Sequence, residues 1–203
     1  MKIYDYGIAP NPRRVRIFLH EKGIDVPFQT LDILKHEGHT PEFLAKNPLG
    51  GIPVLELDDG TCISESVAIC RYFEALHPDP PLFGATPTEI AQVDMWLRRI
   101  EIYLMSQVGL VWLHGHKATA HLLEQKPDVA EFGRARTHHF YSILNTALEG
   151  KTFLACDRYT AVESVALATL DFAVSMVGVP YKDDHINLKS WHEMMSARDS
   201  AGA

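Results

Sequence analysis

A short pattern in the first half of the chain is suited to binding a peptide through its backbone. Ile52 precedes Pro53 at the start of a predicted strand, and a proline there cannot donate to the sheet, so it belongs at an edge or in a special turn. The cis form is readily accessible only for bonds before proline, and we expect the Ile52–Pro53 bond to be cis. The backbone N–H and C=O of Ile52 would then be free to pair with an extended peptide.

An acid and a hydroxyl follow at the start of the next predicted helix, as Glu65 and Ser66. The Glu65 carboxylate can accept hydrogen bonds from an ammonium group. The Ser66 hydroxyl and the first free N–H groups of the helix can hold a carboxylate. The pattern therefore predicts a site that holds an amino-acid head and a peptide backbone together.

Alternating strand and helix signals surround this pattern in the first half of the chain. A helix is predicted to begin with Asn11 as N-cap and Pro12 at the first helical position, and to end at Gly23. We predict strands over residues 2–6, 26–31, 54–57 and 61–64, the last two joined by an Asp-Gly turn. A second helix is predicted over 66–76, with its buried side formed by Val67, Cys70, Ala75 and Leu76.

The second half of the chain is predicted to be helical. Residues 78–85 contain three prolines and a glycine and are predicted to be a linker. Thr86 with Glu89 and Thr160 with Glu163 each form a capping-box pattern that predicts a helix start. A last helix is expected over residues 188–197. The predicted domains are therefore 1–77, the linker 78–85, and an all-helical domain over 86–203.

The combination resembles the glutathione transferase family, and the resemblance covers nearly the whole chain. It implies a thioredoxin-like α/β N-terminal domain followed by an all-α C-terminal domain. It also implies that Ile52, beside a cis Pro53, pairs with the cysteinyl backbone of glutathione. By the same resemblance, Glu65 and Ser66 hold the γ-glutamyl end, and His39 stands where the family often has a cation near the glycyl carboxylate.

The residue that activates the thiolate departs from the family pattern. The position that carries a serine in many relatives is Ala9, which has no hydroxyl, and the position of an alternative cysteine is Asn11. The Asn11 amide can donate to a thiolate. Tyr6 is the other candidate, because its phenol lies near the end of the first predicted strand. Tyr103, Trp112 and His114 are candidates to line an electrophile pocket between the domains.

The bulk composition restricts the class of protein. The 203 residues are 46% hydrophobic and 22% charged, with a formal net charge of −7, which argues against general nucleic-acid binding. No apolar run is long enough to predict a membrane span. The three cysteines and 11 histidines lack metal-ligand spacing, so no metal is expected, and the cysteine usage fits a cytoplasmic protein.

We therefore expect an enzyme, a cytoplasmic and homodimeric glutathione S-transferase with a role in detoxification. It would use glutathione as co-substrate and conjugate it to a small-molecule electrophile. Two alternatives remain open at this point. One is a glutathione-dependent disulfide or peroxide reductase, and the other is a non-catalytic glutathione-binding protein of the same fold.

Overall fold

The computed structural model describes residues 1–203, which form two compact units. Unit 1 contains residues 1–83 and 199–203, and unit 2 contains residues 84–198. This division differs from the expected domains in two ways. Unit 1 extends to residue 83 instead of 77, and it includes residues 199–203, which were expected in the helical domain. Leu82 and Phe83 lie within the expected linker but are buried, at 3% and 4% exposed. The last residues pack on unit 1, where the Ser200 hydroxyl donates to Glu21.

Unit 1 is built around a mixed four-stranded sheet of order β2-β1-β3-β4. β1 is parallel to β2 and antiparallel to β3, which in turn is antiparallel to β4, with Ile3 opposite both Phe28 and Leu55. The hairpin turn closes where Leu57 N–H donates to the Thr61 carbonyl. The strands are β1 (Lys2–Asp5), β2 (Phe28–Thr30), β3 (Val54–Glu56) and β4 (Cys62–Ser64).

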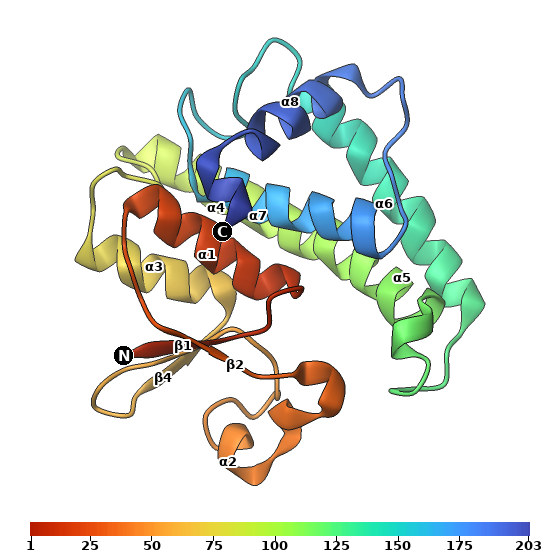
Figure 1. Cartoon of the computed structure of the whole chain (residues 1–203). Coiled ribbons are helices and arrows are strands. Elements are labelled where there is room, and N and C mark those ends of the chain that lie inside the picture. Colours follow the sequence, from red (N-terminus) through yellow and green to blue (C-terminus); the bar gives the residue numbers. More distant parts are fainter. The chain divides into compact units, whose positions relative to one another are not determined.

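Helices cover both faces of this sheet because the side chains of β1 alternate between them. Ile3 is fully buried on the face where α1 (Pro10–Lys22) and α3 (Ser66–Leu76) lie side by side (Figure 1). Tyr4 points to the other face and makes an edge-on ring contact of 5.3 Å with Phe43 of the short helix α2 (Pro41–Leu44). This is the predicted thioredoxin-like layout.

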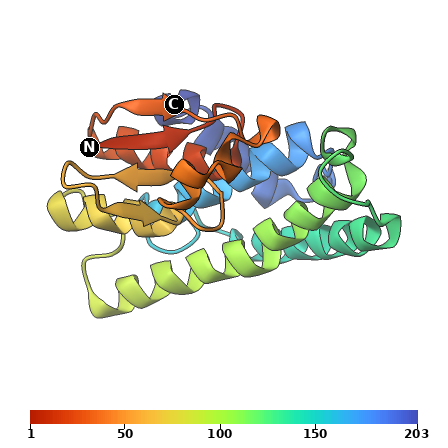
Figure 2. The same ribbon diagram turned by 90° about the horizontal axis from the view of Figure 1, so that it is seen from below.

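Unit 2 is all-helical, as predicted. α4 (Pro87–Arg99) runs through a π-helical segment, Ile100–Met105, into α5 (Ser106–Gly115) as one rod, visible in Figure 2. α6 (Pro127–Ala147) packs along α5. α7 (Ala161–Asp171) is buried over nearly its whole surface and continues into a second π-helical segment, and α8 (Ile186–Ser196) follows.

The predicted bounds of α3 and three predicted helix signals are confirmed, whereas α8 begins at Ile186 instead of residue 188 and the predicted start of α1 is wrong. Both capping boxes form, and Gly23 ends α1 with a φ of 65°. The N-cap of α1, however, is Ala9 rather than Asn11. Pro10 takes the first helical position, where a fixed φ and a missing N–H are tolerated, so the helix begins earlier than predicted.

The buried side of α3 also differs from the prediction. Val67 and Cys70 are buried, but Ile69 and Phe73 complete the buried face. Ala75 and Leu76 lie in the last turn and are exposed. None of the helices is both long and apolar enough to cross a bilayer. No group of three or more histidine, cysteine or acidic side chains that could hold a metal ion is found.

Candidate functional site

The turn before β3 presents an unpaired backbone segment. Asn47 is buried and organises this turn, since its side-chain NH₂ donates to the Gly51 carbonyl (2.8 Å) and its oxygen accepts from Leu49 N–H (3.2 Å). The Ile52–Pro53 bond is cis, as predicted. Neither the N–H nor the C=O of Ile52 makes a hydrogen bond within the chain, so both are available to a ligand.

Glu65 stands in an unusual backbone conformation at the start of α3. Its φ is 69° and its ψ is 116°, a region that residues with a side chain rarely adopt and that is enriched at ligand-binding sites. Its side chain makes no cap bond to α3 and stays exposed. Ser66 begins the helix and is buried, so free N–H groups of the first turn lie beside its hydroxyl.

A buried arginine lies next to this helix start. Arg14 of α1 is only 3% exposed, and its guanidinium donates to the Ser66 hydroxyl at 3.4 Å. Asn11, one turn earlier on α1, has a buried side-chain oxygen without a hydrogen-bond partner. The two ends of an amide have nearly the same shape, so a half-turn would present the NH₂ donor instead.

These residues line one small groove with a cavity volume of about 140 Å³. The structure therefore brings together five of the residues singled out in the sequence: Asn11, Ile52, Pro53, Glu65 and Ser66. The groove offers an acid for an ammonium group, and an arginine, a hydroxyl and helix N–H groups for a carboxylate. This arrangement complements the head group of an amino acid.

Four of the lining residues were not among the site residues predicted from the sequence. Arg14 stands beside Arg13 in the helix start, and nothing in the sequence alone shows which of the two is buried. Asn47 carries a detectable signal, because an Asn-Pro dipeptide favours a turn in which the asparagine side chain bonds to the backbone. These four residues are Arg14, Asn47, Leu49 and Gly51.

Tyr6 does not line the groove. Its ring packs against the apolar cluster that contains Ala9 and Ile52, and its phenol interacts with the Asp32 carboxylate. Partial burial, and then the negative charge of Asp32, raise the pKa of the Tyr6 phenol above its ordinary value. Tyr6 therefore stays neutral and already has an acceptor for its proton.

His39 lies close to the groove without lining it. Gly38 and Gly50 approach so closely that a Cβ on Gly38 would collide with the Gly50 carbonyl oxygen. A Cβ on Gly50 would in turn lie 3.4 Å from atoms of the His39 ring. The exposed His39 therefore lies beside the turn that leads to Ile52 and Pro53.

In unit 2, the three aromatic candidates for the electrophile pocket do not gather in one cavity. Tyr103 lies in the π-helical segment and lines a pocket with residues of α4 and α6. Trp112 stacks on His116, with ring centres 4.4 Å apart, and contacts Phe172 edge-on. The His114 ring accepts a hydrogen bond from Lys126 N–H at 3.3 Å.

Comparisons with known proteins match the two units to the two domains of one protein family. The profile described as "Glutathione S-transferase, N-terminal domain" matches residues 8–76, and "Glutathione S-transferase, C-terminal domain" matches residues 102–199. The chain is 35% identical to Glutathione S-transferase 2 of Saccharomyces cerevisiae over 98% of its own length and 87% of that protein.

Solved structures agree with the sequence comparison. A glutathione S-transferase domain-containing protein of Marinobacter aquaeolei VT8 superposes with a TM-score of 0.93 at 39% identity, over 98% of this chain and 99% of that one. Gtt2 of Saccharomyces cerevisiae superposes with a TM-score of 0.94 at 34% identity, over 100% of this chain and 99% of that one.

Proposed function

Because the chain belongs to the glutathione S-transferase family, we propose that it binds glutathione in the groove of unit 1 and activates its thiol for conjugation to a small electrophile. The observation that carries this proposal is a groove in which an acidic and a basic side chain lie beside backbone groups that have no hydrogen-bond partner. Glu65 and Arg14 line one groove, and Ile52 leaves both of its backbone groups free beside it.

In the proposed pose, each of these groups contacts one part of glutathione. The ammonium group of the γ-glutamyl end binds Glu65, while its carboxylate accepts from Ser66, the first N–H groups of α3 and Arg14. The cysteinyl backbone of glutathione pairs with Ile52. His39, exposed beside the turn that leads to Ile52, would meet the glycyl carboxylate.

In this pose Asn11 is the donor to the sulfur. A free cysteine thiol has a pKa near 8.5, and the thiolate is the nucleophile, so the site must favour the anion. Asn11 can donate through its NH₂, and the N-terminus of α1 adds a favourable dipole. Asn11 cannot accept the thiol proton as a base, so the proton passes to solvent. Thiolate attack then forms the carbon–sulfur bond and releases the leaving group of the electrophile.

Turnover assays separate this proposal from its alternatives. Purified protein is given glutathione with a chlorodinitrobenzene-type electrophile and, in parallel, with a mixed disulfide. Conjugation of the electrophile supports the transferase. Reduction of the disulfide without conjugation would show that the protein is a reductase. Glutathione binding without either reaction would show that it is a non-catalytic binding protein.

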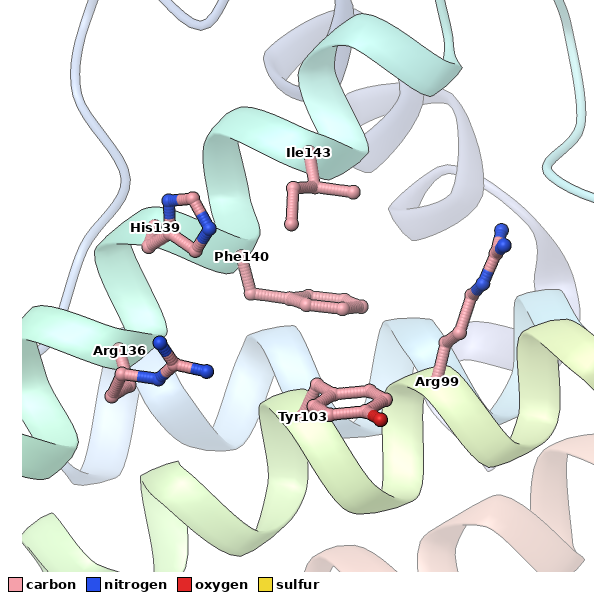
Figure 3. A pocket seen from close by; sticks show the side chains of 6 residues that line it. All are labelled: Arg99, Tyr103, Arg136, His139, Phe140 and Ile143. Atoms are coloured by element: carbon pink, nitrogen blue, oxygen red, sulfur yellow. The ribbon is translucent and has the colours of Figure 1, made fainter.

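The remaining expectations are proposals that rest on the family resemblance. They comprise the homodimer, the cytoplasmic location, the role in detoxification, and a contact of the electrophile with Tyr103, Trp112 or His114, which do not share one cavity, since the pocket around Tyr103 in Figure 3 contains neither of the others. Substitution of Trp112 and of Tyr103 by alanine tests the last of these. A pocket residue should change the KM for the electrophile and leave the KM for glutathione unchanged.

A further inference from the structure

The short 3-10 turn Asp199–Gly202 packs against α1, although the two are far apart along the chain. The turn belongs to unit 1, and Figure 1 shows the C-terminal end of the chain beside α1. Ser200 is only 2% exposed, so the turn is packed rather than loosely attached. The same helix carries Asn11 and Arg14, which line the groove proposed to bind glutathione.

Two hydrogen bonds attach this turn to opposite ends of α1. Near the start of the helix, Arg13 donates from Nη2 to the Ala201 carbonyl oxygen at 2.9 Å. In the last turn of the helix, the Glu21 carboxylate accepts from the buried Ser200 hydroxyl. Arg13 and Glu21 are about two helical turns apart, roughly 12 Å along the axis. The 3-10 turn therefore holds α1 at two separate points.

Both of these α1 side chains carry the charge that the helix dipole disfavours at their position. A cation is unfavourable near a helix N-terminus, where Arg13 lies, and an anion is unfavourable near a C-terminus, where Glu21 lies. No acidic side chain in the first turn of α1 offsets Arg13. Since neither residue stabilises α1 through the dipole, their contacts with the 3-10 turn explain their presence.

The two neighbouring arginines of α1 bind on different sides of the helix. Successive residues of an α-helix project about 100° apart. Arg14 donates to the Ser66 hydroxyl at the groove, whereas Arg13 donates to the Ala201 carbonyl of the 3-10 turn. The contact of Arg13 therefore restrains the rotation of this end of α1, and with it the side of the helix, including Asn11, that meets the groove.

We propose that Arg13, Glu21 and Ser200 are positioning residues of the groove, through which the 3-10 turn sets the place of the N-terminal end of α1. This inference rests on the proposed function, because the groups that it positions are the Asn11 donor to the thiolate and the Arg14 guanidinium. None of the three positioning residues lines the groove. Loss of their contacts would displace both groups, and hydrogen bonds weaken steeply with such misplacement.

The test is calorimetric titration of glutathione into the full chain, with the pKa of the bound thiol read from thiolate absorbance against pH. Ser200→Ala changes no charge, and it should weaken binding about threefold to tenfold and raise the pKa of the bound thiol. Glu21→Ala should have the same two effects. Glu21→Gln removes the same charge but keeps an acceptor for the hydroxyl, so it should stay near wild type. The double variant of Ser200→Ala and Glu21→Ala should lose no more affinity than either single variant, because both remove one contact.

Asp199→Asn is the matched control, because Asp199 is an exposed residue of the same 3-10 turn. It should leave the affinity and the pKa of the bound thiol unchanged. Amide hydrogen exchange separates positioning from a loss of folding: Ser200→Ala should speed exchange in α1 and leave β3 unchanged, whereas a general destabilisation would speed both.

Three results would overturn the inference and leave the groove assignment intact. The first is wild-type affinity together with a wild-type pKa of the bound thiol in Ser200→Ala. The second is an equal loss of affinity in Asp199→Asn. The third is an equal loss in Glu21→Gln and Glu21→Ala. Absence of glutathione binding by the wild-type protein is a different failure, which would overturn the proposed function and this inference with it.

Discussion

At the scale of single residues, the two candidates for thiolate activation have different surroundings. Asn11 lines the groove and has a buried side-chain oxygen without a partner. The Tyr6 phenol interacts with Asp32 and does not line the groove. The structure therefore favours Asn11, and it also removes the helix-capping role that the sequence predicted for this residue.

Replacing Asn11 by alanine should raise the pKa of glutathione bound to the protein. The amide donor is lost, while the helix dipole remains, so the thiolate loses one of its stabilising interactions. Thiolate absorbance measured against pH on the complex reports this pKa. Stability should hardly change, because Asn11 is not the N-cap and the usual loss of about 0.5–2 kcal/mol for a removed cap does not apply.

Tyr6→Phe is the matched control for this measurement. It removes a hydroxyl that interacts with Asp32 rather than with the groove. The pKa of bound glutathione should therefore stay at its wild-type value. A rise in Tyr6→Phe with no change in Asn11→Ala would reverse the assignment of the donor.

At the scale of secondary-structure elements, capping patterns could be predicted from sequence because they depend on local hydrogen bonds. Thr86 with Glu89 and Thr160 with Glu163 are such patterns, and both helices begin where predicted. The start of α1 was predicted at Asn11 instead of Ala9, because Pro10 and Pro12 both suit the first helical position. The π-helical segments have no comparable sequence signal, because packing rather than local bonding decides them.

The two capping boxes should differ in their contribution to stability. Glu163 is fully buried and accepts from Leu154 N–H (2.8 Å) and Thr160 N–H (2.9 Å). Glu163→Ala should lower the free energy of unfolding by about 2–6 kcal/mol, because two buried backbone donors lose their partner at about 1–3 kcal/mol each. Thr86→Ala, in the exposed box, should cost only about 0.5–2 kcal/mol. Urea unfolding measures both, and equal losses would contradict the account.

Glu89 should make unfolding depend on pH. Two hydrogen bonds of 2.7 Å from Arg158, together with backbone N–H groups at the start of α4, lower the pKa of Glu89 to about 2. The folded pKa lies below the unfolded value of about 4.3, so the stabilisation is complete above about pH 5 and is lost as the pH falls toward 2.

Glu89→Gln should therefore lower the Tm at pH 7, and this difference from wild type should shrink between about pH 5 and pH 3. Glu131→Gln provides a control with an exposed acid, whose contact to Arg134 is 3.7 Å. Its Tm should stay near that of wild type throughout. A Glu89→Gln difference that is constant down to pH 3 would show that the ion pair does not stabilise the fold.

At the scale of the whole molecule, the architecture could be predicted from sequence, because alternating strands and helices followed by helices alone describe few folds. The groove could be predicted in part, since Ile52, Pro53, Glu65 and Ser66 lie in recognisable local patterns. Arg14 and the position of His39 could not, because they depend on the packing of α1 on α3 and on the approach of Gly38 to Gly50.

The homodimer is a prediction at this same scale. It rests on analogy with the family rather than on the geometry of the chain. Light scattering at micromolar concentration should give twice the mass of one chain of 22.8 kDa. A monomeric mass across that range would contradict it, without affecting the groove, whose lining residues all belong to one chain.

The central claim is that the groove of unit 1 binds glutathione through Glu65 and its neighbours. Calorimetric titration of glutathione into wild type, Glu65→Ala and Glu42→Ala tests it directly. Glu65→Ala should weaken binding by about 1.5–3 kcal/mol, the scale of a hydrogen bond to a charged group, which is roughly a tenfold to hundredfold increase in Kd. Glu42→Ala, an exposed acid of the same unit outside the groove, should bind as wild type does. An unchanged affinity in Glu65→Ala would contradict the account.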